Sequence, residues 1–96
     1  MIRHIVFINF KPGTPEEVIS EIETDLKALK GSISEIREFE CGRDLIHSER
    51  SFDFALISAF DDLDALQRYQ VHPVHQAVVA KIKAAAESTK AVDYSF

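Results

Sequence analysis

The residues best suited to chemistry lie together in the seven-residue segment Tyr69–His75, Tyr-Gln-Val-His-Pro-Val-His. The segment holds two of the four histidines, one of the two tyrosines and a proline. An imidazole takes up and releases protons near neutral pH, and a phenol donates a hydrogen bond to an oxygen that becomes negative during a reaction. The segment therefore predicts a site for acid–base chemistry.

A break between two helices positions these side chains. Asp61 and Asp62 open a helical region in which Leu63, Leu66 and Tyr69 are spaced for one face. Pro73 interrupts that region, because the residue before a proline is pushed out of helical geometry. We expect a short helix, a break at His72 and a longer helix over 74–87. The inward stripe of the longer helix is His75, Val78, Val79, Ile82 and Ala86.

His75 and Tyr69 are the candidate catalytic pair. His75 lies on the apolar stripe, where burial lowers the pKa of a histidine and leaves a neutral imidazole that can accept a proton. Tyr69, before the break, could present its hydroxyl to the same cavity as a donor to an oxyanion. The alternatives are a core histidine bound to a backbone carbonyl and a tyrosine at a pocket rim with its hydroxyl in water.

Three further residues are candidate ligand contacts. His72 could bind ligand, although a histidine at a helix break can instead bond the loose backbone groups there. His4 lies inside an apolar strand, where its polar ring needs a partner. Asp93, in the last strand, is a carboxylate that could orient a histidine. His47 lies in a polar loop and is expected to be solvated.

Other chemistries have little support. His72 and His75 are three residues apart, but Pro73 breaks the helical geometry that a metal site would use, and no HExxH pattern or cysteine pair is present. Cys41 has no neighbours that would lower its pKa. The three glycines form no phosphate-binding loop. We expect no metal ion and no cofactor.

The remaining pattern predicts a helix between Thr14 and Gly31, with Thr14 as N-cap and Glu17 completing a capping box. The expected strands cover residues 2–10, 33–42, 52–60 and 89–96. This βαββαβ order is typical of the ferredoxin-like α+β sandwich, here as a single domain over residues 1–96. Residues 2–10 and 52–60 are apolar on both faces, and helices can cover only one. We expect the other face to pack on a second copy, giving a homodimer.

The overall composition argues against a nucleic-acid-binding or membrane-spanning protein and favours a cytoplasmic location. With a formal charge of −5 and scattered basic residues, the chain lacks the clustered basic face of a nucleic-acid-binding protein. It also lacks the run of about 20 apolar residues that spans a membrane. A strand pattern follows Met1 at once, so we expect no signal or transit peptide, and the lone Cys41 suits a reducing cytoplasm.

The opening Ile2–Lys11, the segment Phe60–Leu66 and the Tyr-x-x-His-Pro-x-His pattern of Tyr69–His75 resemble the stress-responsive dimeric α/β-barrel (Dabb) family. The resemblance covers essentially the whole chain. It implies a ferredoxin-like protomer and a homodimer formed through the sheets. The family includes plant stress proteins and a plant polyketide cyclase, olivetolic acid cyclase.

The resemblance to the cyclase implies residue roles. Tyr69 would bind or polarise the substrate, and His75 would be the general base of an aldol condensation. His4 and Asp93 match its early-strand histidine and last-strand aspartate. Phe54 stands where the cyclase has a further histidine, so one polar pocket group is missing.

Three functions remain open at this point. The first is a homodimeric small-ligand-binding or stress-responsive protein with no assigned activity, for which a small apolar or aromatic carbonyl compound is a possible ligand. The second is a cofactor-independent lyase or cyclase that uses Tyr69 and His75 as its acid–base pair. The third is a cofactor-free monooxygenase of the dimeric α/β-barrel type, an analogy of fold alone.

Overall fold

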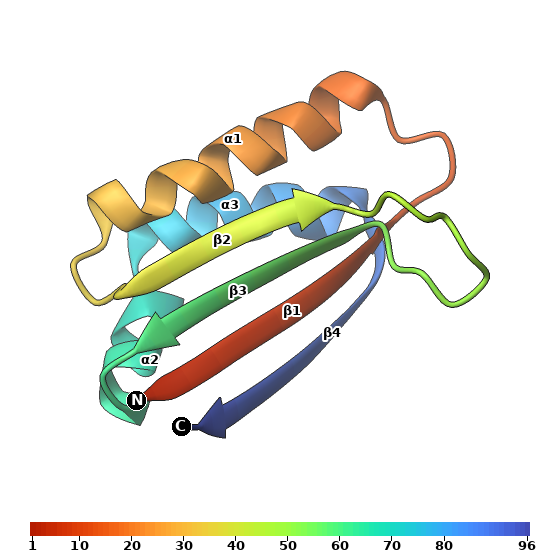
Figure 1. Ribbon diagram of the computed structural model, residues 1–96. Coiled ribbons are helices and arrows are strands. Elements are labelled where there is room, and N and C mark those ends of the chain that lie inside the picture. Colours follow the sequence, from red (N-terminus) through yellow and green to blue (C-terminus); the bar gives the residue numbers. More distant parts are fainter.

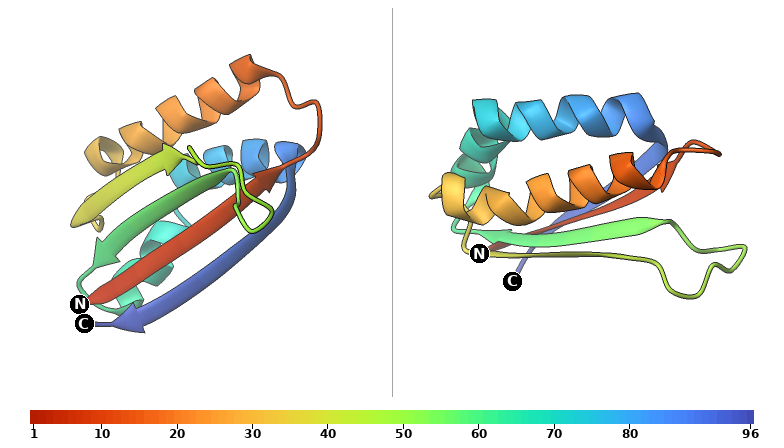
Figure 2. Two further views of the ribbon diagram at one scale, coloured as in Figure 1. Left: turned by 45° about the vertical axis from the view of Figure 1, so that its right-hand side comes forward. Right: turned by 90° about the horizontal axis from the view of Figure 1, so that it is seen from above.

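The protein is a sheet with helices on one side, and the computed structural model describes residues 1–96. Its elements are β1 (Ile2–Phe10), α1 (Glu16–Ser32), β2 (Glu38–Arg43), β3 (Phe54–Phe60), α2 (Leu63–Gln70), α3 (Pro73–Ala85) and β4 (Ala86–Ser95). The four strands are antiparallel in the order β2-β3-β1-β4. Figures 1 and 2 show α1 and α3 side by side over the same face of this sheet. The ferredoxin-like βαββαβ arrangement predicted from the sequence is confirmed.

The core lies between the sheet and the helices. Strand alternation places His4, Ile8 and Phe10 of β1 on the covered face, and all three are buried. Helix α1 contributes Ile22, Leu26 and Leu29, which recur at helical spacing and are at most 1% exposed. No helix is both long enough and apolar enough to cross a lipid bilayer.

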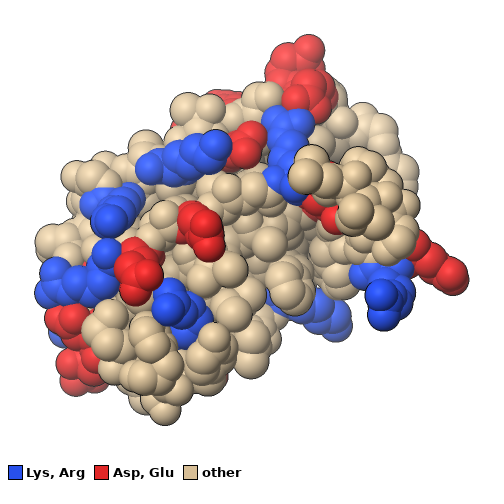
Figure 3. Space-filling model, in the orientation of Figure 1, with Lys and Arg blue, Asp and Glu red and all other residues tan.

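The opposite face of the sheet has no helix on it. Phe7, Val92 and Tyr94 are all more than 40% exposed on this open face, and Phe7 packs on Phe52 with ring centroids 5.9 Å apart. Figure 3 views the molecule in the orientation of Figure 1 and shows large uncharged areas between scattered acidic and basic side chains. The two-sided apolar character predicted for β1 is therefore present, with one side uncovered.

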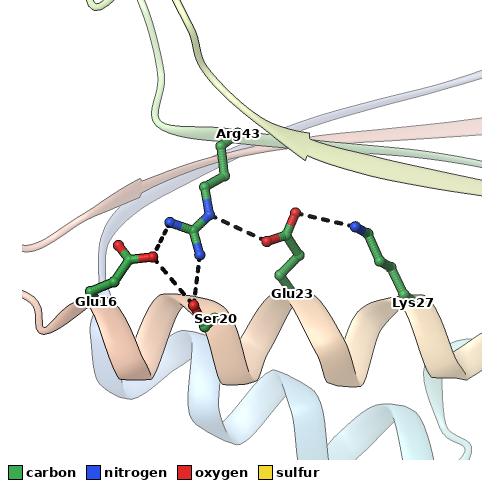
Figure 4. A network of polar contacts seen from close by, with 5 residues as sticks. All are labelled: Glu16, Ser20, Glu23, Lys27 and Arg43. Atoms are coloured by element: carbon green, nitrogen blue, oxygen red, sulfur yellow. Dashed lines mark hydrogen bonds and ion pairs between the residues drawn. The ribbon is translucent and has the colours of Figure 1, made fainter.

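An ionic network joins the end of β2 to α1 (Figure 4). The Arg43 guanidinium donates to the carboxylate of Glu16, to the Ser20 hydroxyl at 3.0 Å and to Glu23 at 3.3 Å. Glu23 also pairs with Lys27 at 3.5 Å. Because these groups are partly in water, the network orients α1 on the sheet more than it stabilises the fold.

The predicted capping of α1 is wrong. The helix begins at Glu16 with Pro15 as its N-cap residue, and no side chain caps it. Thr14 instead donates its hydroxyl to the Lys11 carbonyl at 2.6 Å, and its backbone N–H bonds the same oxygen. The turn before the helix uses the hydroxyl that a capping box would need. Gly31, expected at the helix end, lies inside its last turn.

Several predicted boundaries also shift. Strand β2 begins at Glu38 rather than at residue 33, because Ile33 and Ile36 are buried in the connection after α1 and seal that end of the core. Strand β3 begins at Phe54, so Phe52 packs on the open face instead of beside Phe54. The change from α3 to β4 comes at residue 86, earlier than expected.

We predict that Ile22→Ala lowers the free energy of unfolding by about 2–5 kcal/mol, because it removes a side chain that is fully buried between α1 and the sheet. Urea unfolding at constant pH measures the change. The control is Leu63→Ala, a truncation of a side chain that is 64% exposed; it should cost no more than about 0.5 kcal/mol. Equal losses in the two variants would contradict the position of the core described above.

Candidate functional site

A cavity of about 210 Å³ opens between the sheet and the helices on the β4 side of the core. Strands β1, β3 and β4 and all three helices contribute to its wall. Its lining residues are His4, Val6, Ile8, Leu26, Leu56, Tyr69, His75, Val78, Val79, Ile82, Lys83 and Thr89. Aliphatic side chains make most of this wall, so the few polar groups on it stand out as candidates for binding or catalysis.

Tyr69 reaches the cavity from the last turn of α2. Asp62 starts this helix by accepting a hydrogen bond from the Ala65 backbone N–H at 2.8 Å. The Tyr69 ring packs on Phe60 at 4.8 Å and on His75 at 4.1 Å between ring centroids. No hydrogen bond joins its hydroxyl to another group of the protein, and the residue lines the cavity. Burial raises the pKa of Tyr69, so the group stays protonated and can donate.

His75 enters from the first turn of α3, directly after the predicted break. His72 is the N-cap residue, and its Nδ1 accepts from the Val74 backbone N–H at 3.1 Å. Pro73 follows at the first helical position, where its missing N–H costs nothing. The prediction that His72 and Pro73 shape the break is therefore confirmed.

One hydrogen bond sets the tautomer of His75. Its Nδ1 lies 3.2 Å from the Gln70 backbone carbonyl oxygen. A carbonyl can only accept, so Nδ1 carries the proton and the neutral ring keeps a lone pair on Nε2. The backbone partner expected for a core histidine is thus present, yet it leaves the second nitrogen free to accept a proton.

The environment of His75 favours the neutral ring. Burial is the main cause that lowers its pKa, and nearby His4 and His72 add smaller effects in the same direction. The bond to Gln70 acts in the opposite direction but does not outweigh burial. At neutral pH His75 is therefore a base rather than a cation.

His4 and Asp93 form a pair across the β1–β4 ladder. They are directly opposed in the strand register, and His4 Nδ1 bonds Asp93 Oδ1. The His4 ring lies 6.3 Å from the Tyr69 ring. Asp93 thus orients a histidine from within the sheet, as expected, and the partner that His4 needs is present.

The other chemistry-bearing residues lie elsewhere. His72 does not line the cavity, since its ring caps α3. His47 is exposed in the loop between β2 and β3. Burial raises the pKa of the Cys41 thiol, which makes it a poor nucleophile. No group of three or more His, Cys, Asp or Glu side chains is arranged to hold a metal ion.

The sequence patterns did not identify two polar residues of the cavity wall, Lys83 and Thr89. Lys83 lies one turn after Val79, which belongs to the predicted inward stripe, although that stripe does not include Lys83 itself. Thr89 shares the strand parity of Asp93. Spacing places each of them only on the inward side of its own element; that both line one cavity depends on how α3 and β4 are arranged in the fold. They were passed over because lysine and threonine are ordinary surface residues.

Together these groups offer one hydrogen-bond donor and one proton acceptor. The Tyr69 hydroxyl can donate a hydrogen bond, and the free Nε2 of His75 can accept a proton. The two rings are in contact, so one small molecule can reach both groups.

The sequence matches a known protein family over almost its whole length. The family model of the stress-responsive A/B barrel domain matches residues 2–96. An uncharacterized protein of Streptomyces coelicolor is 41% identical over 83 residues, which cover 83% of this chain and 84% of that protein.

Two solved structures share the fold. A dimeric ferredoxin-like protein of unknown function from Thermobifida fusca has a TM-score of 0.90 at 28% identity and covers 99% of this chain and 90% of its own. A hydroxynitrile lyase from Passiflora edulis has a TM-score of 0.86 at 24% identity. The match covers 97% of this chain and 90% of the lyase chain. At that identity the likeness to the lyase shows the fold alone.

We predict that the His75 imidazole titrates with a midpoint below 6.5 in an NMR titration of the folded protein. The folded state favours the neutral ring, so the unfolded chain takes up the proton first as the pH falls. The free energy of unfolding should therefore decrease as the pH falls from about 6.5 towards the folded-state pKa. His75→Gln should lose that share of the decrease.

The control for this titration is His47→Gln, which changes an exposed loop residue and should leave the His75 midpoint in place. A midpoint at or above 6.5 for His75 would mean that its ring is solvated or ion-paired, and the base assigned above would be wrong.

Proposed function

Because this chain belongs to the family of stress-responsive A/B barrel domains, we propose that it is a homodimer whose cavity binds a small, mostly apolar carbonyl compound. One observation carries the proposal. Within an aliphatic cavity, a protonated phenol and an imidazole with a free nitrogen lie side by side. A filled core would have used both groups for bonds within the protein.

The size of the cavity limits the ligand. Its volume of about 210 Å³ is below the range of about 300–1,000 Å³ that is common for drug-sized ligands. Phe54, at the position where the cyclase resembled above has a histidine, is 1% exposed and packs on Phe10 at 6.4 Å. Phe54 does not line this cavity, so it adds no polar group where the cyclase has a histidine; the small, mostly aliphatic wall favours a compact ligand over an extended polyketide.

A second candidate function is catalysis by the same pair. His75 Nε2 would take a proton from the carbon beside the carbonyl; the electrons of that C–H bond would form a carbon–carbon double bond while the π electrons of the carbonyl move onto its oxygen. The Tyr69 hydroxyl would stabilise the resulting enolate through a hydrogen bond. The free lone pair on His75 favours this function, because a ligand-binding site alone does not need it.

The reaction class that fits is that of an aldol-type lyase or cyclase. The enolate carbon can attack a second carbonyl, and the reverse reaction breaks the same bond. A protein of Passiflora edulis with this fold is a hydroxynitrile lyase, which supports a lyase as the reaction class. A monooxygenase would differ in consuming oxygen with its substrate, so an oxygen electrode separates the two classes.

The dimer is supported by the open face of the sheet. Ile5 and Ile57 are directly paired in the register of β1 and β3 and only half-buried, beside the more exposed Phe7. The Thermobifida fusca protein with the same fold is dimeric. Packing this face on a second copy would remove the apolar side chains from water.

We predict that the wild-type protein accelerates deuterium exchange at the carbons beside the carbonyl of 2-octanone in D2O, followed by proton NMR. His75→Gln should reduce the accelerated rate by about 10²–10⁴-fold, because it removes the base. Tyr69→Phe should reduce it as well, because the enolate loses its donor. His47→Gln serves as the matched histidine control and should keep the wild-type rate.

The outcomes separate the two candidate functions. If the ketone shifts the NMR signals of the Tyr69 and His75 side chains but no exchange is accelerated, the binding function stands and catalysis is excluded for this probe. If the ketone leaves those signals unchanged, the proposed ligand class is wrong.

We predict that Phe7→Glu converts the dimer to a monomer in light scattering after gel filtration, because it places a charge on the apolar open face that we propose as the interface. Leu63→Glu changes an apolar residue that is also exposed but lies on α2 away from the open face, and it should remain a dimer. A monomeric wild-type protein would disprove the proposed assembly.

A further inference from the structure

We infer that the ligand of this cavity carries a carboxylate as well as a carbonyl, and that Lys83 binds the carboxylate. This inference rests on the proposed function and narrows its ligand class. The observation behind it is the distribution of polar groups along the cavity. His4, Tyr69 and His75 lie at one end, and Lys83 and Thr89 lie at the other.

The spacing of the two ends follows from the elements that form the wall. On α3, Lys83 comes eight residues after His75, which corresponds to about 12 Å along the helix axis. On the sheet, Thr89 is paired with Ile8, and Ile8 comes four residues after His4, about 13 Å along β1. Helix and sheet thus give the same separation. Val79 and Ile82 lie between the two ends of α3 and keep the middle apolar.

The charge of Lys83 is not used within the protein. The neighbouring Lys81 is paired with Glu21 at 2.9 Å and with Asp25 at 2.6 Å. Lys83 forms no ion pair, although acidic residues exceed basic ones by five in this chain. It is an exposed cation among the residues that line the mostly aliphatic cavity, and Thr89, also exposed, adds a hydroxyl donor to the same wall.

Electrostatics also orients the ligand. The His75 end holds a neutral imidazole, and the Asp93 carboxylate lies behind His4 at the same end. An anionic group is repelled there and attracted at the Lys83 end, where a charge-assisted hydrogen bond is available. The ligand class is therefore a small oxo acid, with the carbonyl at Tyr69 and His75, a short hydrocarbon middle and the carboxylate at Lys83.

The test compares two probes of equal length, 7-oxooctanoate and 2-octanone, which differ only in a carboxylate replacing the terminal methyl group. NMR titrations that follow the Tyr69 and His75 side chains give the two Kd values. We expect the wild-type protein to bind the oxo acid about fivefold more tightly than the ketone, as one partly exposed ion pair allows. Added salt should reduce this preference.

Lys83→Met keeps the length and helical preference of the side chain but removes its charge. It should abolish the preference for the oxo acid and leave the affinity for 2-octanone unchanged. The matched control is Lys30→Met, which removes another lysine without an ion pair, at the end of α1 and away from this cavity. That variant should keep the wild-type preference.

The results distinguish this inference from the proposed function. If 2-octanone binds at Tyr69 and His75 but the oxo acid binds no more tightly, or if Lys83→Met retains the preference, the carboxylate site is disproved and the carbonyl site stands. If neither probe affects the Tyr69 and His75 signals, both are disproved. A loss of the preference in Lys30→Met would show that general charge, not Lys83, produces it.

Discussion

The break between α2 and α3 is the constraint on which the site depends. Without it, one continuous helix would carry Tyr69 and His75 on different faces, because residues six apart on a helix are far from the same direction. Pro73 ends that continuity, and the His72 ring caps the new helix start. The freed Gln70 carbonyl then holds the His75 ring by its Nδ1. The tautomer of the candidate base is therefore a consequence of how the chain turns between two helices.

The same break explains why the site needs no long polar network. His75 is oriented by one backbone oxygen, and the ring of Tyr69 is clamped between Phe60 and His75. The pair of His4 and Asp93 is separate, and it is built from the sheet register rather than from the helices. Two independent parts of the fold thus meet at one end of the cavity. The His4–Asp93 pair is closed within the protein, whereas the Tyr69 hydroxyl and His75 Nε2 keep their hydrogen-bonding capacity for a ligand.

Much of this arrangement could be predicted from residue types and spacing. The element order, the break at Pro73 and the inward direction of His75 all follow from strong local signals. The cap of α1 could not be predicted, because the Thr14 hydroxyl has two partners within reach and the turn at Lys11 takes it. The early part of the expected second strand failed for a similar reason: Ile33 and Ile36 are apolar enough for a strand, but they close the core from a turn. Lys83 and Thr89 were missed because placing them requires the packing of α3 against β4, which no local pattern contains.

Strand β4 lies at the edge of the sheet, with a hydrogen-bonded neighbour only on its β1 side. Thr89 and Asp93 project from this strand towards the site, but the residues around them are largely exposed and carry little of the core. We expect substitutions on β4 to change the free energy of unfolding little, because its residues are largely exposed, and to alter the cavity wall directly. The base and its donor are held by the helix break, and β4 reaches that end of the cavity only through the bond of Asp93 to His4. Substitutions at the Thr89 end of this edge strand can therefore alter ligand choice while the reactive end stays the same, which offers a simple physical route for one fold to acquire several specificities.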